Sequence, residues 1–336
     1  APSAKQRNRI AKQNNLKGWS CSKGVFLTSM KTQNFTLEIH GFTGHLVQPD
    51  RYKDTAVLVL TGNEKGLLPA ARVAGRFAQY RHLALAVPLT GAERTPEDPD
   101  RIPLDVLEPA VKFLKEFKGI QHVAVYGTSM GSLFALLAAL YIPDIDQCVC
   151  VSGTHVVYEG SGENHTSSGH SVVTWKGKEL PFVRLDLSKD MRSAFEEAYQ
   201  DSGQEALAAV PVEDIPGSIL ILAADSDETW PADYSAKYME KRMKKNREPG
   251  SYKGIIYKKA SHILGLLPDE STQNWLYRFS RISYTSLRKY PKECVKALEQ
   301  SQQEILTFLN HGRKVTLITN TEQDAAGKDK APAAAK

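Results

Sequence analysis

The sequence has little of several features that would settle a functional class at once. It has only 4 cysteines in 336 residues, too few for a disulfide framework. No run approaches the roughly 18 apolar residues of a membrane span. The formal net charge is +5, and the basic residues are spread out instead of forming a stripe interleaved with aromatic residues. These absences argue against a disulfide-stapled chain, a membrane span and a nucleic-acid partner.

Sites for metals and phosphates are also missing from the pattern. The sequence has no Cys/His spacing typical of a metal site and no glycine-rich phosphate loop, so we expect neither metal nor cofactor. Cys148 and Cys150 alternate with valines, which is typical of two small core thiols on one face of a strand. Cys21 and Cys294 could pair, although nothing in the sequence requires it.

What the chain does have is enough apolar content to build a large α/β domain. It is 41% hydrophobic. Residues 1–33 are rich in Lys, Arg, Gln and Asn and are interpreted as an N-terminal arm, while residues 313–336 are interpreted as a partly disordered tail. The domain between them, residues 34–312, is expected to open with a hairpin over Phe35–Pro49.

Apolar strand patterns then alternate with helical ones. The predicted strands cover residues 55–60, 82–89, 121–127, 148–153, 218–225 and 254–262; the predicted helices cover 69–80, 104–117 and the run after Ser129. Such alternation predicts a mostly parallel central sheet with helices on both faces.

Residues 155–216 interrupt this alternation and are interpreted as a cap, or lid, over the carboxyl edge of the sheet. The aromatic residues there are candidate linings of a substrate pocket, although an ordinary core role weighs at least as much. They are Trp175, Phe182, Phe195 and Tyr199, and Trp230 beyond the cap is a further candidate.

The most informative motif is Gly-Thr-Ser-Met-Gly, Gly127 to Gly131, between a strand and a helix. Gly-x-Ser-x-Gly in that context is the nucleophile elbow, in which glycines relieve crowding at a sharp turn that presents a serine hydroxyl. Ser129 is therefore the predicted nucleophile. A serine that merely caps the helix is the less favoured alternative.

A serine nucleophile needs a base and an orienting acid, which follow it in the order acid, then histidine. Asp225 and Asp227 lie at and just beyond the end of the strand predicted over residues 218–225; Asp227 is favoured as the acid, and Asp225 as a residue that caps or braces the loop. His262 follows the last strand and is the only histidine in the required order and context. The main-chain amide of Met130 and that of Gly62 or Asn63 are the candidate oxyanion donors.

With these residues assembled, the chain resembles the α/β-hydrolase domain of the family of acyl-CoA thioesterases and bile acid-CoA:amino acid N-acyltransferases. The resemblance covers most of residues 41–309 and rests on GFTGHLVQP, the Gly-Leu-Leu segment after residue 65, LEPAVKFLKEF, DSDETWP and KASHILGLLP. It implies the α/β-hydrolase fold with a cap insertion. It also supports Asp227, three residues before Trp230, as the acid. In that family a serine at the elbow favours hydrolysis, whereas a cysteine favours transfer to an amine.

We therefore expect a serine hydrolase that cleaves a small-molecule acyl thioester or ester through an acyl-enzyme on Ser129. Departures from the family after the third strand and after His262 keep a carboxylesterase related to dienelactone hydrolases open, and a catalytically silent binding protein is the alternative from another class. Oligomeric state stays open. So does the compartment, with the cytoplasm preferred and secretion allowed if a leader has been removed.

Overall fold

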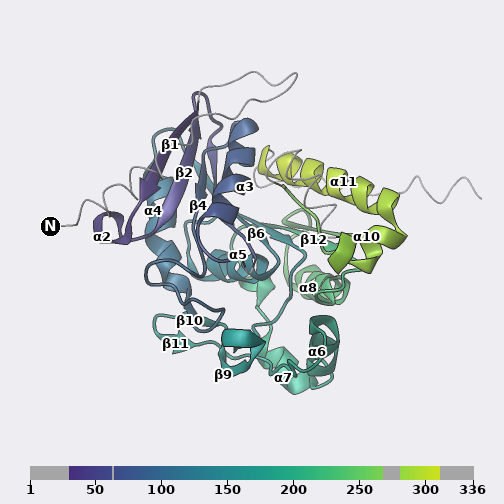
Figure 1. The fold of residues 1–336 in the computed structure, drawn as a ribbon. Helices are drawn as coiled ribbons and strands as arrows, with labels where there is room; N and C mark the ends of the chain where they lie inside the picture. The colour runs from purple at the N-terminus through teal and green to yellow at the C-terminus, as the bar shows by residue number, and fades with distance from the viewer. Residues whose placement is uncertain (1–29, 63, 268–280, 311–336) are drawn as a thin grey trace, which may run out of the picture.

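A sheet of eight strands forms the centre of the molecule (Figure 1). The computed structural model describes residues 30–62, 64–267 and 281–310. The strand order is β1-β2-β4-β3-β6-β7-β12-β13. The first two pairings, β1 with β2 and β2 with β4, are antiparallel, and all pairings from β4 to β13 are parallel. The strands are β1 (Met30–Phe35), β2 (Gly44–Pro49), β3 (Thr55–Leu60), β4 (Ala84–Ala86), β6 (His122–Thr128), β7 (Gln147–Val151), β12 (Ser218–Ala224) and β13 (Tyr252–Tyr257).

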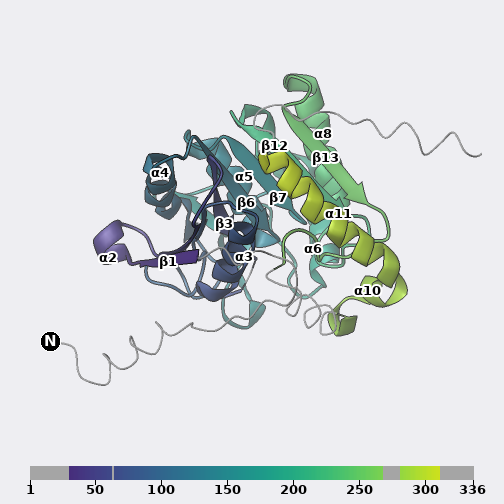
Figure 2. The ribbon, with the colours of Figure 1, turned by 90° about the horizontal axis from the view of Figure 1, so that it is seen from above.

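Helices cover both faces of this sheet (Figure 2). The helices α4 (Glu108–Glu116), α5 (Met130–Tyr141) and α8 (Ala232–Asn246) pack on one face, and α3 (Leu68–Gln79) and α11 (Pro291–Asn310) pack on the other. Successive side chains of one strand point to opposite faces, so Leu58 belongs to the first core and Val57 to the second. This explains why the central strands read as unbroken apolar runs.

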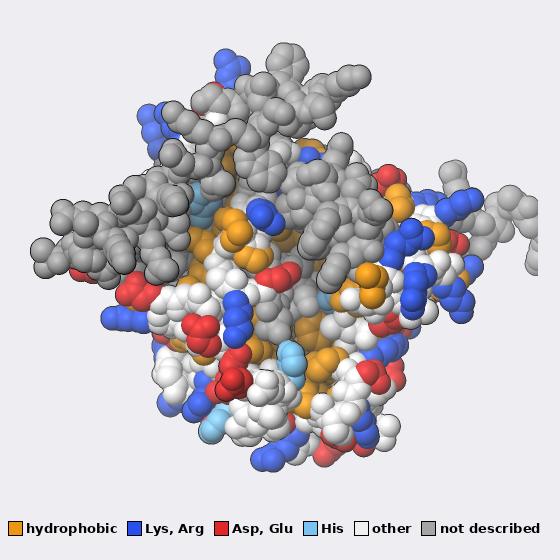
Figure 3. All heavy atoms as spheres, viewed as in Figure 1, with side chains coloured by type: hydrophobic (Ala, Val, Ile, Leu, Met, Phe, Trp, Pro, Cys, Tyr) orange, Lys and Arg blue, Asp and Glu red, His pale blue; other side chains and the backbone are white. Residues whose placement is uncertain are grey.

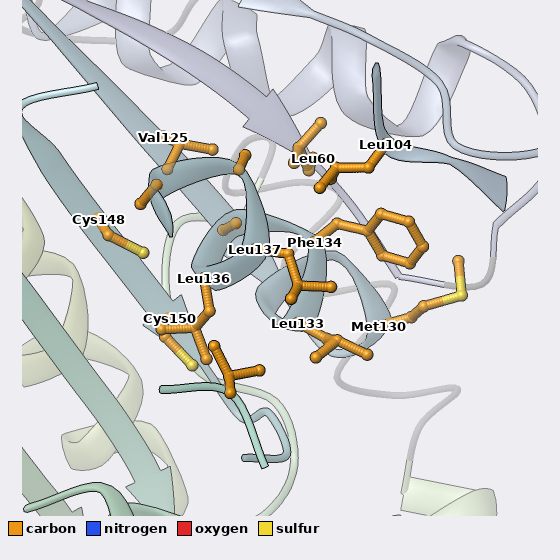
Figure 4. Packing of buried hydrophobic residues seen from close by; sticks show 14 of the residues in the cluster. Leu60, Leu104, Val125, Met130, Leu133, Phe134, Leu136, Leu137, Cys148 and Cys150 are labelled. Carbon is orange, nitrogen blue, oxygen red and sulfur yellow. The ribbon is translucent and has the colours of Figure 1, made fainter. Parts of the chain in front are cut away.

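Helix α5 is the most deeply buried of these helices. Its residues are apolar on every side, which is the pattern of a core helix. Figure 4 shows Phe134 and Leu137 beside Leu60, and Leu136 beside Cys150. Because α5 is packed on all sides, its first residue, Met130, is held in a fixed position. Cys148 and Cys150 lie in this core as predicted.

Residues 155–216, the segment interpreted as a cap and called the cap below, lie along one edge of the body in Figure 1. It contains β8 (Glu159–Ser161), β9 (Ser167–Ser171), β10 (Val173–Trp175), β11 (Lys178–Glu179), α6 (Met191–Ala198) and α7 (Ser202–Ala208). Strand β10 pairs with β5 (Ile102–Pro103) of the body. The 3-10 segments are η1 (Leu104–Leu107), η2 (Glu163–His165) and η3 (Val212–Asp214), and two short helices are α2 (Leu37–His40) and α10 (Thr285–Lys289).

A buried histidine joins the cap to the body. His155 Nδ1 lies 3.0 Å from Ser235 Oγ of α8, and its Nε2 lies 3.1 Å from Glu205 Oε1 of α7. Burial lowers the pKa of His155, so its neutral form is favoured. The cap is thus attached to the body through a satisfied polar network rather than through apolar contacts alone.

Three strand predictions need correction. The strand predicted over residues 254–262 is β13, which begins two residues earlier and ends at Tyr257. The predicted hairpin over Phe35–Pro49 is wrong in its first arm, because β1 ends at Phe35 and the short helix α2 follows it. The strand was missed because its residues, MKTQNF, are exposed up to Phe35 and show no apolar alternation. The strand predicted over residues 82–89 is shortened to Ala84–Ala86.

The predicted fold class is confirmed: the central sheet is mostly parallel and is covered by helices on both faces. Most of the arm and the whole tail lie outside the described residues, as does Cys21. In the part of the chain that is described, no helix has the length and apolar character needed to cross a membrane.

Candidate active site

Ser129 occupies the turn between β6 and α5. Its backbone angles are φ 56° and ψ −126°, which an L-residue adopts only under strain. Strands β3 and β7 pair with β6 on either side, and the amide of Ser129 donates to Val151 O at 2.9 Å. The strain is therefore imposed by a fixed strand and a fixed helix, and it presents the serine at the positive end of α5.

The two glycines of the motif are required by close backbone contacts. A Cβ on Gly127 would lie 2.1 Å from the carbonyl oxygen of Gly131, and one on Gly131 would lie 2.4 Å from that of Thr61. Both neighbours are main-chain atoms, which cannot move aside as a flexible side chain can. Glycine is therefore needed at these positions for space, as the motif predicts.

His262 lies against the serine. Its Nε2 is 3.0 Å from Ser129 Oγ, and its Nδ1 is 2.8 Å from Asp227 Oδ2. A carboxylate only accepts hydrogen bonds, so Nδ1 carries the proton and Nε2 is left to accept the proton of the serine hydroxyl. The structure thus brings together the three residues that the sequence singled out.

Asp227 is buried and held on both oxygens. Its Oδ1 accepts from the amides of Thr229 at 2.8 Å and Trp230 at 3.3 Å, while Oδ2 faces His262. The loop is fastened further by the indole of Trp230, which donates to Ser152 O at 2.6 Å. These bonds fix the direction in which the carboxylate meets the imidazole.

Asp225 has a different role in the same loop. Its Oδ1 accepts the amide of Lys259 at 2.6 Å, three residues before His262. Asp225 therefore braces the histidine loop, as we expected for the residue nearer the strand end, and does not contact the imidazole.

Two buried hydroxyls hold the far side of the histidine loop. Tyr126 Oη, from β6, accepts the amide of Leu266 at 3.0 Å, and Ser301 Oγ, from α11, accepts that of Gly265 at 2.9 Å. Burial raises the pKa of Tyr126, which keeps the hydroxyl neutral. Sequence reasoning missed both residues; a tyrosine in a fully buried strand was the available signal, because its hydroxyl needs a partner.

A cavity of about 390 Å³ opens beside the serine. Apolar side chains make up much of its wall: Met130, Tyr158, Leu185, Leu187, Met191 and Trp230. Polar residues, including His165 and Asp190, lie among its other lining residues. In Figure 3, hydrophobic side chains are exposed just below the centre of the molecule. The volume lies in the usual range for small-molecule sites.

Of the five aromatic residues predicted to line a pocket, only Trp230 lines this cavity. Phe195 is wholly buried behind it, with its ring edge-on to Trp230 at 5.5 Å, and the hydroxyl of Tyr199 lies 2.9 Å from Thr154 Oγ1. Trp175 stacks on Tyr141 instead, at 5.0 Å. Phe182 packs against the main core. These four residues pack in or against the core, which is the alternative that the sequence also allowed.

The structure describes two of the three candidate oxyanion donors, Met130 and Gly62. Met130 is the first residue of α5, and Gly62 lies so close to the serine that a Cβ on it would be 3.1 Å from Ser129 Cβ. Asn63 lies outside the described residues. The loop after β3 therefore reaches Ser129, as expected for a loop that supplies an oxyanion donor.

Tyr284 borders the imidazole from the other side. Its ring lies 6.0 Å from that of His262, and its hydroxyl lies 3.2 Å from Thr229 Oγ1. Burial raises its pKa. In the described ranges, no group of three or more His, Cys, Asp or Glu side chains is arranged to hold a metal ion.

Comparison with known proteins agrees with the predicted resemblance. Residues 102–268 match the family described as the C terminal of BAAT and acyl-CoA thioester hydrolases. The chain is 24% identical over 196 residues to the acyl-coenzyme A amino acid N-acyltransferase 2 of Mus musculus, covering 57% of this chain and 45% of that protein. It is 21% identical over 172 residues to the mouse peroxisomal succinyl-coenzyme A thioesterase, covering 51% of this chain and 40% of the relative. The matches thus span less than half the length of either relative.

Solved structures resemble the fold over most of its length. A putative dienelactone hydrolase from Klebsiella pneumoniae matches 84% of this chain and 99% of its own, with 14% identity and a TM-score of 0.52. The Pf2001 esterase of Pyrococcus furiosus matches 85% of this chain and 94% of its own, with 14% identity and a TM-score of 0.50. The chain has the α/β-hydrolase fold.

Proposed function

We propose that this protein is a serine hydrolase that cleaves an acyl thioester or ester through an acyl-enzyme on Ser129. The observation that carries the proposal is the chain of contacts from Asp227 through His262 to Ser129, at 2.8 and 3.0 Å. A neutral serine is a poor nucleophile, and a base within hydrogen-bond reach removes its proton as it attacks.

In the first half of the reaction, Ser129 Oγ attacks the acyl carbon and its proton passes to His262 Nε2. Asp227 stabilises the resulting imidazolium. The negative charge on the former carbonyl oxygen is stabilised by hydrogen bonds from the amide of Met130 and an amide of the loop after β3. Gly62 is the candidate for this second donor among the residues that the structure describes. The bond to the leaving thiol or alcohol breaks, and the leaving group takes the proton from His262.

In the second half, water replaces the leaving group. His262 accepts a proton from the water as its oxygen attacks the acyl-enzyme, and Ser129 recovers its proton when the acid departs. A serine rather than a cysteine at the elbow supports water, and not an amine, as the acceptor of the acyl group. No cofactor takes part in either half of this scheme.

The apolar cavity supports an apolar acyl group as the part of the substrate bound beside Ser129. Burial of one methylene is worth about 0.8 kcal/mol, so each added carbon is expected to raise kcat/KM by up to ~4-fold until the cavity is full. The match to the thioester hydrolase family supports acyl-CoA as the first choice of substrate, with a simple carboxylester next.

The test compares acyl-CoA with p-nitrophenyl esters of the same acyl groups, from two carbons upward, using wild type and Ser129→Ala. The proposal expects hydrolysis of at least one series, a rise with chain length followed by a plateau or fall, and loss of activity in the variant. Activity that survives in Ser129→Ala contradicts it. A folded wild type that hydrolyses neither series and resists serine-directed reagents favours a binding protein.

A further inference from the structure

A carboxylate stands beside the nucleophile and has no part in the scheme above. A Cβ placed on Gly62 would lie 3.4 Å from Ser129 Oγ and 3.2 Å from Glu64 Oε2. Both oxygens therefore flank the same small space at the end of β3. That space is on the side of the serine where the oxyanion donor of the β3 loop is expected.

A second observation relates Glu64 to the side of the site where His262 lies. Burial is the main cause that raises the pKa of Tyr284, and the charges of Asp227, Glu228 and Glu64 add smaller contributions in the same direction. Tyr284 lies 6.0 Å from the ring of His262. The negative charge of Glu64 therefore acts on the side of the site where His262 lies as well as on the side of Ser129.

Among the residues that the structure describes, no cation is paired with the charge of Glu64. In residues 30–62, 64–267 and 281–310, no Lys, Arg or His forms an ion pair with it, and the adjacent Lys65 pairs with Asp98 at 2.9 Å. The side chain is exposed, so solvent screens its charge partly and salt screens it further.

Glu64 is not among the residues that line the cavity. If the cavity takes the acyl group, the carboxylate is left near the path of the leaving group. An anion there would be repelled and a cation attracted. Two unit charges about 6 Å apart change a rate by about 3-fold at the dielectric constant of water and by up to about 100-fold at the value of about 20 that is typical near a protein surface.

We propose that Glu64 selects substrates by the charge that the leaving group carries near the scissile bond, disfavouring an anionic group and favouring a cationic one. This inference rests on the proposed hydrolase function. It is compatible with acyl-CoA, because the part of that leaving group next to the sulfur is uncharged. The same charge also opposes the developing oxyanion, so its removal is expected to raise the rate on a neutral substrate.

The test uses three butyryl thioesters that differ in the charge of the thiol: thiocholine (cationic), N-acetylcysteamine (neutral) and 2-mercaptoethanesulfonate (anionic). A thiol reagent follows all three reactions in the same way. For wild type we expect kcat/KM for the cationic thioester to exceed that for the anionic one at least 10-fold at low salt, and the ratio to shrink at 1 M salt.

Glu64→Gln is expected to lower this ratio about 5- to 10-fold and to raise kcat on the neutral thioester. Glu64→Lys is expected to reverse the order. Glu299→Gln on α11 removes the same unit of charge from an exposed site away from the nucleophile and serves as the control, with the ratio unchanged.

The outcomes separate this inference from the function it rests on. Hydrolysis of the neutral thioester with a ratio that Glu64→Gln and Glu64→Lys leave unaltered overturns the role of Glu64 alone. No hydrolysis of any of the three, together with no labelling of Ser129 by a fluorophosphonate, overturns the hydrolase function itself. Labelling of Ser129 in both Glu64 variants verifies that they are folded.

Discussion

Arg192 of the cap holds the loop that carries Asp227. Its Nη1 donates to the main-chain carbonyl oxygen of Asp227 at 2.6 Å, and its Nε donates to Glu196 at 2.8 Å. The preceding residue, Met191, lines the cavity. One turn of α6 therefore contacts both the cavity and the loop of Asp227, so the cap is expected to position Asp227 as well as to cover the site.

We expect Arg192→Gln to lower kcat about 10-fold, because a hydrogen bond from a charged donor is lost at the acid loop. Arg192→Lys is expected to restore part of the activity. Steady-state kinetics over a pH series separates this from a general loosening of the cap, which would raise KM and leave kcat and its pH profile in place. An unchanged kcat in Arg192→Gln would show that the contact does not position Asp227.

The two aspartates of the acid loop provide a matched pair. Asp227→Asn leaves His262 without its charged partner and is expected to lower kcat by about 10³- to 10⁴-fold. Asp225→Asn removes only the acceptor for the Lys259 amide and is expected to cost less than ~10-fold, with a small loss of thermal stability. The assignment is reversed if the Asp225 variant is the more damaged of the two in kcat.

The effect of replacing a glycine by alanine is expected to depend on the space around that glycine. Gly127→Ala places a Cβ 2.1 Å from a carbonyl oxygen and is expected to destabilise the fold by ~3 kcal/mol or more. Gly75→Ala lies inside α3 with nothing within 4 Å of the new Cβ and is expected to stabilise it by ~0.5–1 kcal/mol. Urea unfolding of the two variants measures both signs, and equal effects would contradict the packing account of the elbow.

Acid stability is expected to depend on His82. Burial, with the nearby charge of Lys53, lowers its pKa from 6.5 to about 4. Between these values the unfolded chain binds a proton that the folded chain does not, so stability is lost as the pH falls from 6.5 towards 4, by ~3 kcal/mol in all. His82→Gln keeps a donor for Thr55 O and an acceptor for Lys53 Nζ but does not titrate. Urea unfolding at pH 7 and 4.5 is expected to show a smaller loss for the variant, and an equal loss would contradict this role.

The parts of this structure that sequence could predict are those with local causes. The elbow is visible because its glycines, strand and helix are contiguous, and the sheet is visible because strands buried on both faces form unbroken apolar runs. Strand β1 was missed because its exposed polar residues carry no such pattern. Among the candidate site residues, Asp227 could be preferred over Asp225 only through spacing and the family resemblance.

The contacts around the site could not be predicted, because they join segments far apart in the chain. The sequence left Phe195 as either a pocket lining or a core residue, and it did not show that Tyr158 and Trp230 stand between Phe195 and the cavity. Nothing in the sequence distinguishes Arg192 and Glu64 from other charged residues. Their relation to Asp227 and Ser129 is visible only in the structure, where the cap and the β3 loop lie beside these residues.

The measurement that tests the account most directly is the intact mass of the protein after treatment with a fluorophosphonate, with Ser129→Ala as the control. The account predicts one adduct on wild type, located at Ser129, and none on the variant, because only a serine beside a base is activated enough to react. An unlabelled but folded wild type, or an adduct that persists in Ser129→Ala, would contradict the assignment of Ser129 as the nucleophile.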